Sequence, residues 1–147
     1  MSTDDSGGAA SAPHPVRHLT VWPRRWAVCR LEPAADIPAW ATRHTALTVI
    51  ARSDAELSIV APESVVPADG LIERGFRVLA LQGPIPFSTT GVIAAVAAPL
   101  AEAGISLFPI ATYDTDYVMV KETQLDLALA TLRASGWTID LPAPLTA

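Results

Sequence analysis

The sequence predicts an α+β protein with two halves in tandem, the first of them a reduced copy of the second. Three observations predict this organisation. Short β-rich segments recur along the chain, two helical segments separate them in the second half, and stretches of the second half match stretches of the first. A length of 147 residues fits one ordinary domain, or two very small ones that share a core.

Short segments rich in β-branched and apolar residues predict the strands. In chain order they are residues 19–22, 26–31 (WAVCRL), 46–51 (ALTVIA), 57–61 (LSIVA), 76–82 (FRVLALQ), 105–111 (ISLFPIA), 117–121 (YVMVK) and 137–141 (WTIDL). Pro23, Arg24 and Arg25 predict a turn after the first of these. Pro38 leaves room in the first half for only a turn or two of helix, and the stretch 65–70 (VVPADG) is loop-like.

The first predicted helix covers residues 90–103, and its apolar face carries Val92, Val96 and Leu100. Pro99 lies inside this segment and predicts a kink or an early stop, because proline lacks the N–H that continues the helical hydrogen bonds. The residues able to cap its start are Ser88, Thr89 and Thr90, and the residue able to end it is Gly104.

The second predicted helix covers residues 124–135, with Thr123 as its N-cap and Gly136 as its terminator. The order of elements in the second half is therefore β-α-β-β-α-β, and we expect two ferredoxin-like halves with antiparallel sheets and helices on one face. The predicted division is a disordered tail over residues 1–17, halves over 18–74 and 75–141, and a C-terminal tail over 142–147.

The two halves share short stretches. The matched pairs are residues 54–60 (DAELSIV) with 114–120 (DTDYVMV), and Trp26 with Phe76. In this alignment Glu56 stands where the second half has Asp116. Strand 76–81 is apolar on both faces, and helices cover only one face of such a sheet. We therefore expect a homodimer, or sheet contact between the two halves.

Charge and composition exclude several classes of function. Lys and Arg number 10 against 15 Asp and Glu, and they form no basic cluster, so nucleic acid is not an expected partner. Cys29 is the single cysteine, which excludes an internal disulfide framework. The N-terminus lacks the apolar region of a signal peptide, and the most apolar run, 91–101, is too short to span a membrane. We expect a cytoplasmic protein that does not contact a membrane.

Catalytic and metal motifs do not stand out in the sequence. His14, His18 and His44 have no metal-ligand spacing, and Cys29 is expected as a small apolar residue of a core strand. The glycine-containing motifs of hydrolases, phosphate-binding loops and dinucleotide sites do not occur. We therefore expect no enzyme activity, no metal and no cofactor.

Residues 87–120 (FSTTGVIAAVAAPLAEAGISLFPIATYDTDYVMV) resemble an ACT domain. The resemblance rests on Gly91 at the start of the helix, the helix exit 100–105 (LAEAGI) and the strand that follows it. The turn 112–117 (TYDTDY) is similar to that of tandem ACT proteins related to the CASTOR-type arginine sensors and the regulatory domains of aspartate kinase. The resemblance covers about residues 19–141. It implies a non-catalytic regulatory module that binds an amino acid between two ACT-like halves.

Two features of this region suit an amino acid. A helix that opens with Gly91 presents free N–H groups to a carboxylate, and a carboxylate in the turn at Asp114 or Asp116 complements an ammonium group. By the resemblance, Asp116 is the critical acid. The candidate ligand-binding residues are Ser88, Thr89, Thr90, Gly91, Val92, Ala111, Thr112, Tyr113, Asp114 and Asp116.

Plainer interpretations stand beside these. Thr90 or Ser88 can act as a helix cap alone, and a turn aspartate can bond to its own backbone. Many ACT domains that bind amino acids place an acid and a proline before the glycine, whereas this chain has Thr89 and Thr90. The alternative function is therefore an assembly or partner-binding ACT module that has lost its ligand.

Overall fold

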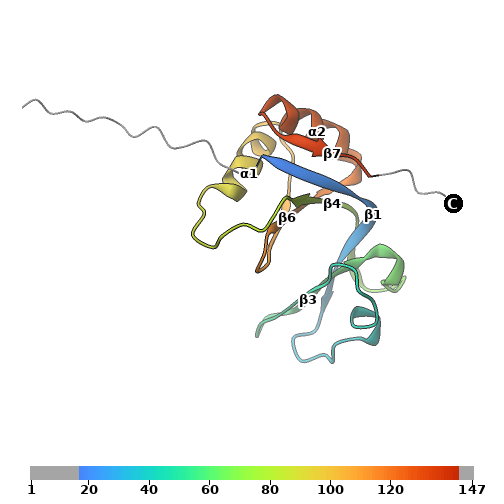
Figure 1. Ribbon diagram of the computed structural model, residues 1–147. Helices are drawn as coiled ribbons and strands as arrows, with labels where there is room; N and C mark the ends of the chain where they lie inside the picture. The colour runs from blue at the N-terminus through green and yellow to red at the C-terminus, as the bar shows by residue number, and fades with distance from the viewer. Residues whose placement is uncertain (1–16, 143–147) are drawn as a thin grey trace, which may run out of the picture.

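The structure of this protein is a computed structural model that describes residues 17–142 (Figure 1). Most of the two predicted tails, 1–17 and 142–147, lies outside the described residues. The strands are β1 (His18–Leu31), β2 (Val49–Arg52), β3 (Leu57–Pro62), β4 (Leu71–Leu81), β5 (Phe108–Ala111), β6 (Asp116–Lys121) and β7 (Thr138–Asp140). The helices are α1 (Val92–Glu102) and α2 (Leu125–Ala134), with short 3₁₀ helices η1 (Ala39–Ala41), η2 (Glu63–Val65) and η3 (Glu122–Gln124).

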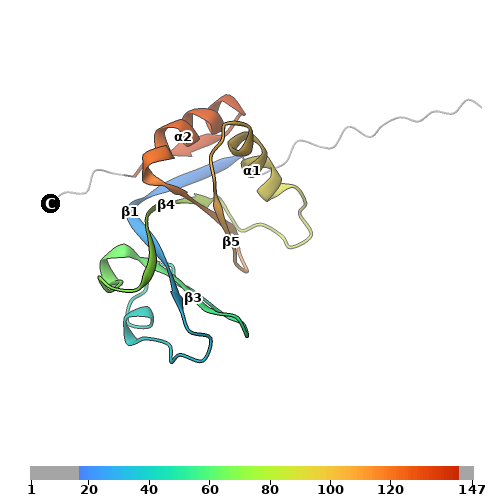
Figure 2. The ribbon, with the colours of Figure 1, turned by 180° about the vertical axis from the view of Figure 1, so that it is seen from behind.

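All of these strands join one seven-stranded sheet in the order β2-β3-β1-β4-β6-β5, and β7 pairs with β1. The β1–β7 pair is parallel and the others are antiparallel. An α+β fold with an antiparallel sheet and two helices is therefore confirmed. Both helices cover the same face of the sheet, and they cover only the part of it formed by the second half (Figures 1 and 2).

β1 and β4 are long strands, and each of them pairs with strands of both predicted halves. The final part of β1 lies between β3 and the start of β4, whereas the final part of β4 lies between β6 and the start of β1. Trp26 and Phe76, which the sequence matches to each other, are direct cross-strand partners. The predicted boundary between residues 74 and 75 therefore falls inside β4.

The turn predicted at Pro23, Arg24 and Arg25 is wrong, because β1 continues through these residues. The register between β1 and β4 shifts between Val21 and Arg25, so the proline lies in a β-bulge, where its missing N–H is tolerated. The Arg77 guanidinium donates to the Trp22 carbonyl in this bulge, from Nη2 at 2.8 Å and from Nε at 3.2 Å. The Arg77 side chain, from β4, thus gives the Trp22 carbonyl the hydrogen bonds that it lacks within the sheet at this bulge.

The sequence predicted a kink or an early stop at Pro99, and the early stop is wrong because α1 continues to Glu102. Because Pro99 has no N–H, the Ala95 carbonyl four residues earlier loses its helical partner. The indole Nε1 of Trp137, just before β7, donates to that carbonyl at 3.2 Å. A tertiary hydrogen bond therefore compensates for the proline.

The predicted caps have mixed outcomes. No side chain caps α1, whose N-cap is Gly91 in the left-handed conformation, and none caps α2, so the predictions for Ser88, Thr89, Thr90 and Thr123 as caps are wrong. Gly104 and Gly136 follow the two helices with φ values of 74° and 92°. Only glycine adopts this conformation without strain, and both glycines end their helices as predicted.

The two faces of β4 belong to two separate clusters of buried side chains. Leu79 and Leu81 face the helices, in a large core that also includes Leu100, Leu132 and Trp137. Val78 faces the other way, where a junction cluster forms between residues of both halves. The buried members of the junction cluster are Trp26, Val60, Val78, Ile110 and Met119. The second apolar face, which led us to expect a dimer or sheet contact, is thus covered by the chain itself.

The first half has no α-helix among its described residues, and only η1 and η2 connect its strands. Its own core is small and contains Cys29, Leu57 and Ile59, with four other small or β-branched residues. Burial raises the pKa of the Cys29 thiol above its ordinary value. Over residues 17–142, no helix is long and apolar enough to cross a membrane.

Candidate functional site

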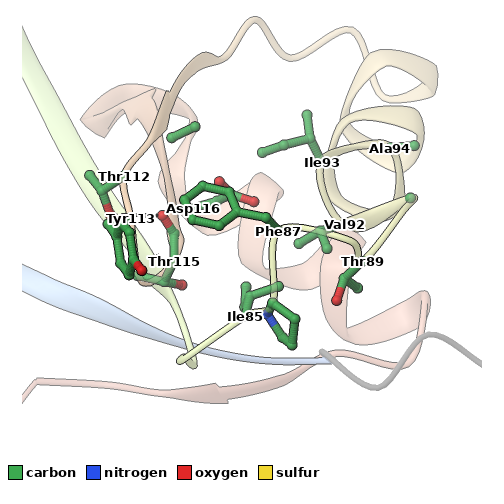
Figure 3. Close-up of a pocket in the computed structure, with 13 residues that line it drawn as sticks. Ile85, Phe87, Thr89, Val92, Ile93, Ala94, Thr112, Tyr113, Thr115 and Asp116 are labelled. Carbon is green, nitrogen blue, oxygen red and sulfur yellow. Dashed lines mark hydrogen bonds between the residues drawn. The ribbon is translucent and has the colours of Figure 1, made fainter.

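A pocket of about 360 Å³ opens at the start of α1 (Figure 3). Three segments form it: the loop that joins β4 to α1, the first turn of α1, and the end of β5 with the turn into β6. Its lining residues are Ile85, Pro86, Phe87, Thr89, Gly91, Val92, Ile93, Ala94, Ala111, Thr112, Tyr113, Thr115 and Asp116. All of them belong to the second half, whereas we expected a site between the halves.

The pocket brings together most of the predicted site residues. Those that line it are Thr89, Gly91, Val92, Ala111, Thr112, Tyr113 and Asp116. Ser88, Thr90 and Asp114 are not among the lining residues. The residues that the sequence interpretation missed are Ile85, Pro86, Phe87, Ile93, Ala94 and Thr115. Part of this missed set carries a signal in the sequence, namely the apolar run 85–87 just before a helix that opens with glycine.

One backbone and one side-chain hydrogen bond hold the loop and the end of β4 against the β5–β6 turn. The N–H of Ile85 donates to the Asp114 carbonyl at 2.6 Å. The Thr115 hydroxyl donates to the Leu81 carbonyl at 2.8 Å, which ties the turn to the end of β4. Gly83 lies so close to Thr115 that a Cβ at this glycine would stand 2.9 Å from the threonine Cβ. Asp114 thus contributes its backbone to the site.

The β5–β6 turn is closed by two bonds to one carbonyl. The N–H and the hydroxyl of Thr112 each donate to the Thr115 carbonyl at 2.9 Å. This closure places Asp116 at the first position of β6, directly opposite Ala111. A short turn that is closed by two hydrogen bonds fixes the direction of the strand that follows it.

Asp116 is the one acidic side chain among the lining residues, which include no lysine, arginine or histidine. Its side chain is half-buried, and this burial raises the pKa of the Asp116 carboxyl above its ordinary value. Over residues 17–142, its carboxylate has no hydrogen-bond or ion-pair partner within the chain. The pocket therefore presents a partly desolvated negative charge without a counter-ion.

The opposite wall is the uncapped start of α1. The first hydrogen bond of the helix joins the Ala95 N–H to the Gly91 carbonyl, so the N–H groups of the three residues between them have no partner within the helix. Such groups carry the positive end of the helix dipole. Gly91 has φ of 79° and no side chain, which leaves this end open to the pocket.

Two exposed aromatic rings stand at the pocket. Phe87 from the loop and Tyr113 from the turn meet edge to face, with ring centroids 5.0 Å apart and planes at 88° (Figure 3). Their exposed fractions are 76% and 80%. Offset or edge-to-face contacts are favourable for aromatic pairs, but most of both rings still faces solvent. The contact joins the two segments that form opposite sides of the opening.

The histidine side chains of the described residues lie outside this pocket. Over residues 17–142, no group of three or more His, Cys, Asp or Glu side chains could hold a metal ion. His18 pairs with Asp140 at 2.6 Å across the β1–β7 pair, and His44 hydrogen-bonds to Thr48 at 3.3 Å. His14 lies outside the described residues.

Comparison with known protein families and structures agrees with this architecture. Residues 71–134 match the model of the ACT domain, and residues 24–69 match a model described as an N-terminal domain. ACT domains are regulatory, non-catalytic domains that typically bind small molecules and often dimerise.

Similar solved structures come from several bacteria. The crystal structure of protein Atu0741 from Agobacterium tumefaciens has 30% sequence identity and a TM-score of 0.83, over 92% of this chain and 99% of that one. A protein of unknown function from Vibrio cholerae has 23% identity and a TM-score of 0.60, over 78% of this chain and 86% of that one. An aspartate kinase from Clostridium acetobutylicum has 10% identity and a TM-score of 0.57, over 77% of this chain and 33% of that one, which shows a shared fold.

The Agobacterium protein decides the family, because the similarity extends over nearly the whole of both chains. The chain therefore belongs to the same family as Atu0741, and its residues 71–134 match the model of the ACT domain.

Proposed function

We propose that this chain is a regulatory module that binds an amino acid in the pocket at the start of α1. The observation that carries the proposal is that one pocket has the Asp116 carboxylate, without a counter-ion, in one wall and the uncapped N–H groups of α1 in another. An amino-acid zwitterion has the complementary pair of charges. Its ammonium group suits Asp116, and its carboxylate suits the helix start.

The open volume supports this proposal over its alternative. An assembly module that had lost its ligand would fill the same space with its own side chains. Here the walls leave about 360 Å³, which falls in the range of small-molecule pockets. The ring of Phe87 remains mostly exposed instead of packing into that space.

A thermal-shift screen of the twenty amino acids tests the proposal. A ligand that binds only the folded state stabilises it by RT ln(1 + [L]/Kd), so the melting temperature rises with the logarithm of the ligand concentration over its Kd. A shift at millimolar concentration by at least one amino acid is expected, and a complete absence of shifts would contradict amino-acid binding.

The variant Asp116→Asn then tests where the ligand binds. It should weaken binding by about 1.5–3 kcal/mol, the usual value of a hydrogen bond to a charged group, in a calorimetric titration. Asp114→Asn is the matched control and should change the affinity much less, because Asp114 contributes its backbone carbonyl to the site. Equal losses in the two variants would show that Asp116 is not the ligand-binding acid.

The wider assignment is also proposed. The first half has the strand order β2-β3-β1-β4, which supports a reduced ACT repeat in which η1 and η2 replace the helices. Halves at 18–74 and 75–141, a place in the CASTOR-type and aspartate kinase branch, and a cytoplasmic location stay predictions. Since ACT domains often dimerise, a homodimer is expected, and light scattering of the purified chain checks it.

A further inference from the structure

We infer that the pocket selects an amino acid with an apolar, uncharged side chain, and that Phe87 and Tyr113 are the residues that recognise this side chain. This inference rests on the proposed function, because it concerns the same pocket. It adds the chemical class of the ligand and the residues that determine it.

The charges of the lining limit the ligand to one ammonium group. Asp116 is the single carboxylate, and no lysine, arginine or histidine lines the pocket. A second carboxylate, as in glutamate, would meet a like charge and no counter-ion. A second ammonium group, as in lysine, would leave one of its two cations without an acid. Taking a charge out of water without a partner is strongly unfavourable, so both classes should bind weakly.

The rest of the lining is apolar on the side of the loop and the helix. The apolar lining residues there are Ile85, Pro86, Phe87, Val92, Ile93 and Ala94. Thr89 is the single hydroxyl in this wall. The wall therefore offers contact surface for a hydrocarbon side chain and few hydrogen-bonding groups for a polar one.

The aromatic pair completes this wall. Phe87 and Tyr113 are the two most exposed of the large apolar side chains in the described part of the chain, at 76% and 80%. They contact each other across the opening, although they come from different segments. An apolar ligand side chain that packs against the rings removes their surface from water, which favours binding. Exposed aromatic surface at a pocket is a common feature of recognition sites.

Titration calorimetry on the full chain tests the inference, with leucine and phenylalanine as apolar ligands and glutamate and lysine as charged ones. At least one apolar amino acid should bind about tenfold or more tightly than either charged one, since a well-matched apolar contact changes affinity by factors of that order. Its binding should also show a negative heat-capacity change, which reports burial of apolar surface.

Variants then test the two rings. Phe87→Ala and Tyr113→Ala should each reduce the ratio of apolar to charged affinities, whereas Phe87→Leu should retain most of it. Leu127→Ala is the matched control, because Leu127 is an exposed apolar residue on α2, away from the pocket lining. This control should leave the affinities unchanged.

The outcomes separate the two proposals. If glutamate or lysine binds as tightly as leucine and phenylalanine, or if the ratio survives both alanine variants, the inference is wrong while amino-acid binding stands. If none of the twenty amino acids binds to a chain that circular dichroism shows to be folded, the proposed function fails and the inference fails with it.

Discussion

The hairpins of the two halves have the same backbone hydrogen bond across the turn and differ in their side chains. In the first half the Ser53 N–H donates to the Glu56 carbonyl at 2.9 Å, and in the second half the Thr112 N–H donates to the Thr115 carbonyl at the same distance. The first pair after each turn is Arg52 with Leu57 in one hairpin and Ala111 with Asp116 in the other.

This register corrects the alignment of the two halves. The residue equivalent to Asp116 is Leu57, not Glu56 as the sequence match predicted. Leu57 is completely buried in the small core of the first half. A position that holds a core leucine in one half therefore holds an acid without a partner in the other. The difference shows that the acid is not required by the hairpin itself.

The helices explain the rest of the contrast. α1 supplies one wall of the pocket, and η1 is the short helix at the corresponding place in the first half. With only three residues, η1 follows Pro38, which occupies its N-cap. Without a full helix, the apolar face of the first hairpin packs on loops and forms a core. In the second half α1 is a full helix, and the hairpin there keeps an open edge beside the start of α1.

Exchanging the two equivalent residues gives the largest expected effect. Leu57→Asp places a carboxylate among apolar side chains, and it should destabilise the fold by about 4 kcal/mol or more, which approaches the whole stability of a small domain. The reciprocal variant Asp116→Leu should retain or raise the urea midpoint and abolish ligand binding. Circular dichroism during urea unfolding measures both. A fold that tolerates Leu57→Asp would show that the two positions are not in comparable surroundings.

Truncating Trp26 in the junction cluster has the second largest expected effect. Trp26 is buried in the junction cluster, and its indole donates to the Leu47 carbonyl at 3.0 Å. Trp26→Ala should destabilise the protein by about 3–5 kcal/mol, as large aromatic truncations do. Because each half is too small to be stable alone, a single unfolding transition should remain. Trp26→Phe, which keeps most of the ring, should cost much less. Two transitions in calorimetry would mean that the halves are independent.

The hydrogen bond that compensates for Pro99 gives a smaller effect. Trp137→Phe leaves the Ala95 carbonyl without a donor and should destabilise the protein by about 1–2 kcal/mol. Pro99→Ala restores the helical N–H. The cost of Trp137→Phe should therefore be smaller in the Pro99→Ala background, which a double-mutant cycle of urea unfolding energies measures. Additive effects would show that the indole does not act through this carbonyl.

The smallest effect concerns the charge of Asp116 in the absence of ligand. Its pKa is raised in the folded state, so the native protein binds this proton more tightly than the unfolded chain does. The resulting stabilisation is present below the ordinary carboxyl pKa of about 4 and is lost as the pH rises through the folded value. Asp116→Asn should thus gain stability relative to the wild type between about pH 4 and neutral pH. A constant difference across this range would contradict the shift.

The sequence predicted the helices and their ends better than the contacts between residues far apart in the chain. The first helix followed from apolar residues at helical spacing such as Val96, and Gly104 and Gly136 ended the two helices as expected. The strand pattern gave no sign that Arg77 would bridge the bulge at Pro23, because that contact joins residues far apart in the chain.

The candidate site was predicted only in part, because some of its walls carry a local sequence pattern and others depend on contacts between distant residues. Gly91 and the turn at 112–117 carry a local pattern, and both came to lie at one pocket. The wall at Ile85 and Phe87 depends on a loop that folds back onto Asp114, which no periodic pattern encodes. The match between Glu56 and Asp116 was wrong by one position, and in a strand a shift of one residue moves a side chain to the opposite face.

The pairing of β1 with β7 has a consequence for biosynthesis. His18 and Asp140 lie 122 positions apart, and their strands are direct neighbours in the sheet. A ribosome releases the first of these strands long before it makes the second. During that time one edge of the N-terminal strand is left without its neighbour, and unpaired edges favour misassembly. Adding β7 to β1 then requires a contact of high sequence separation, which slows folding.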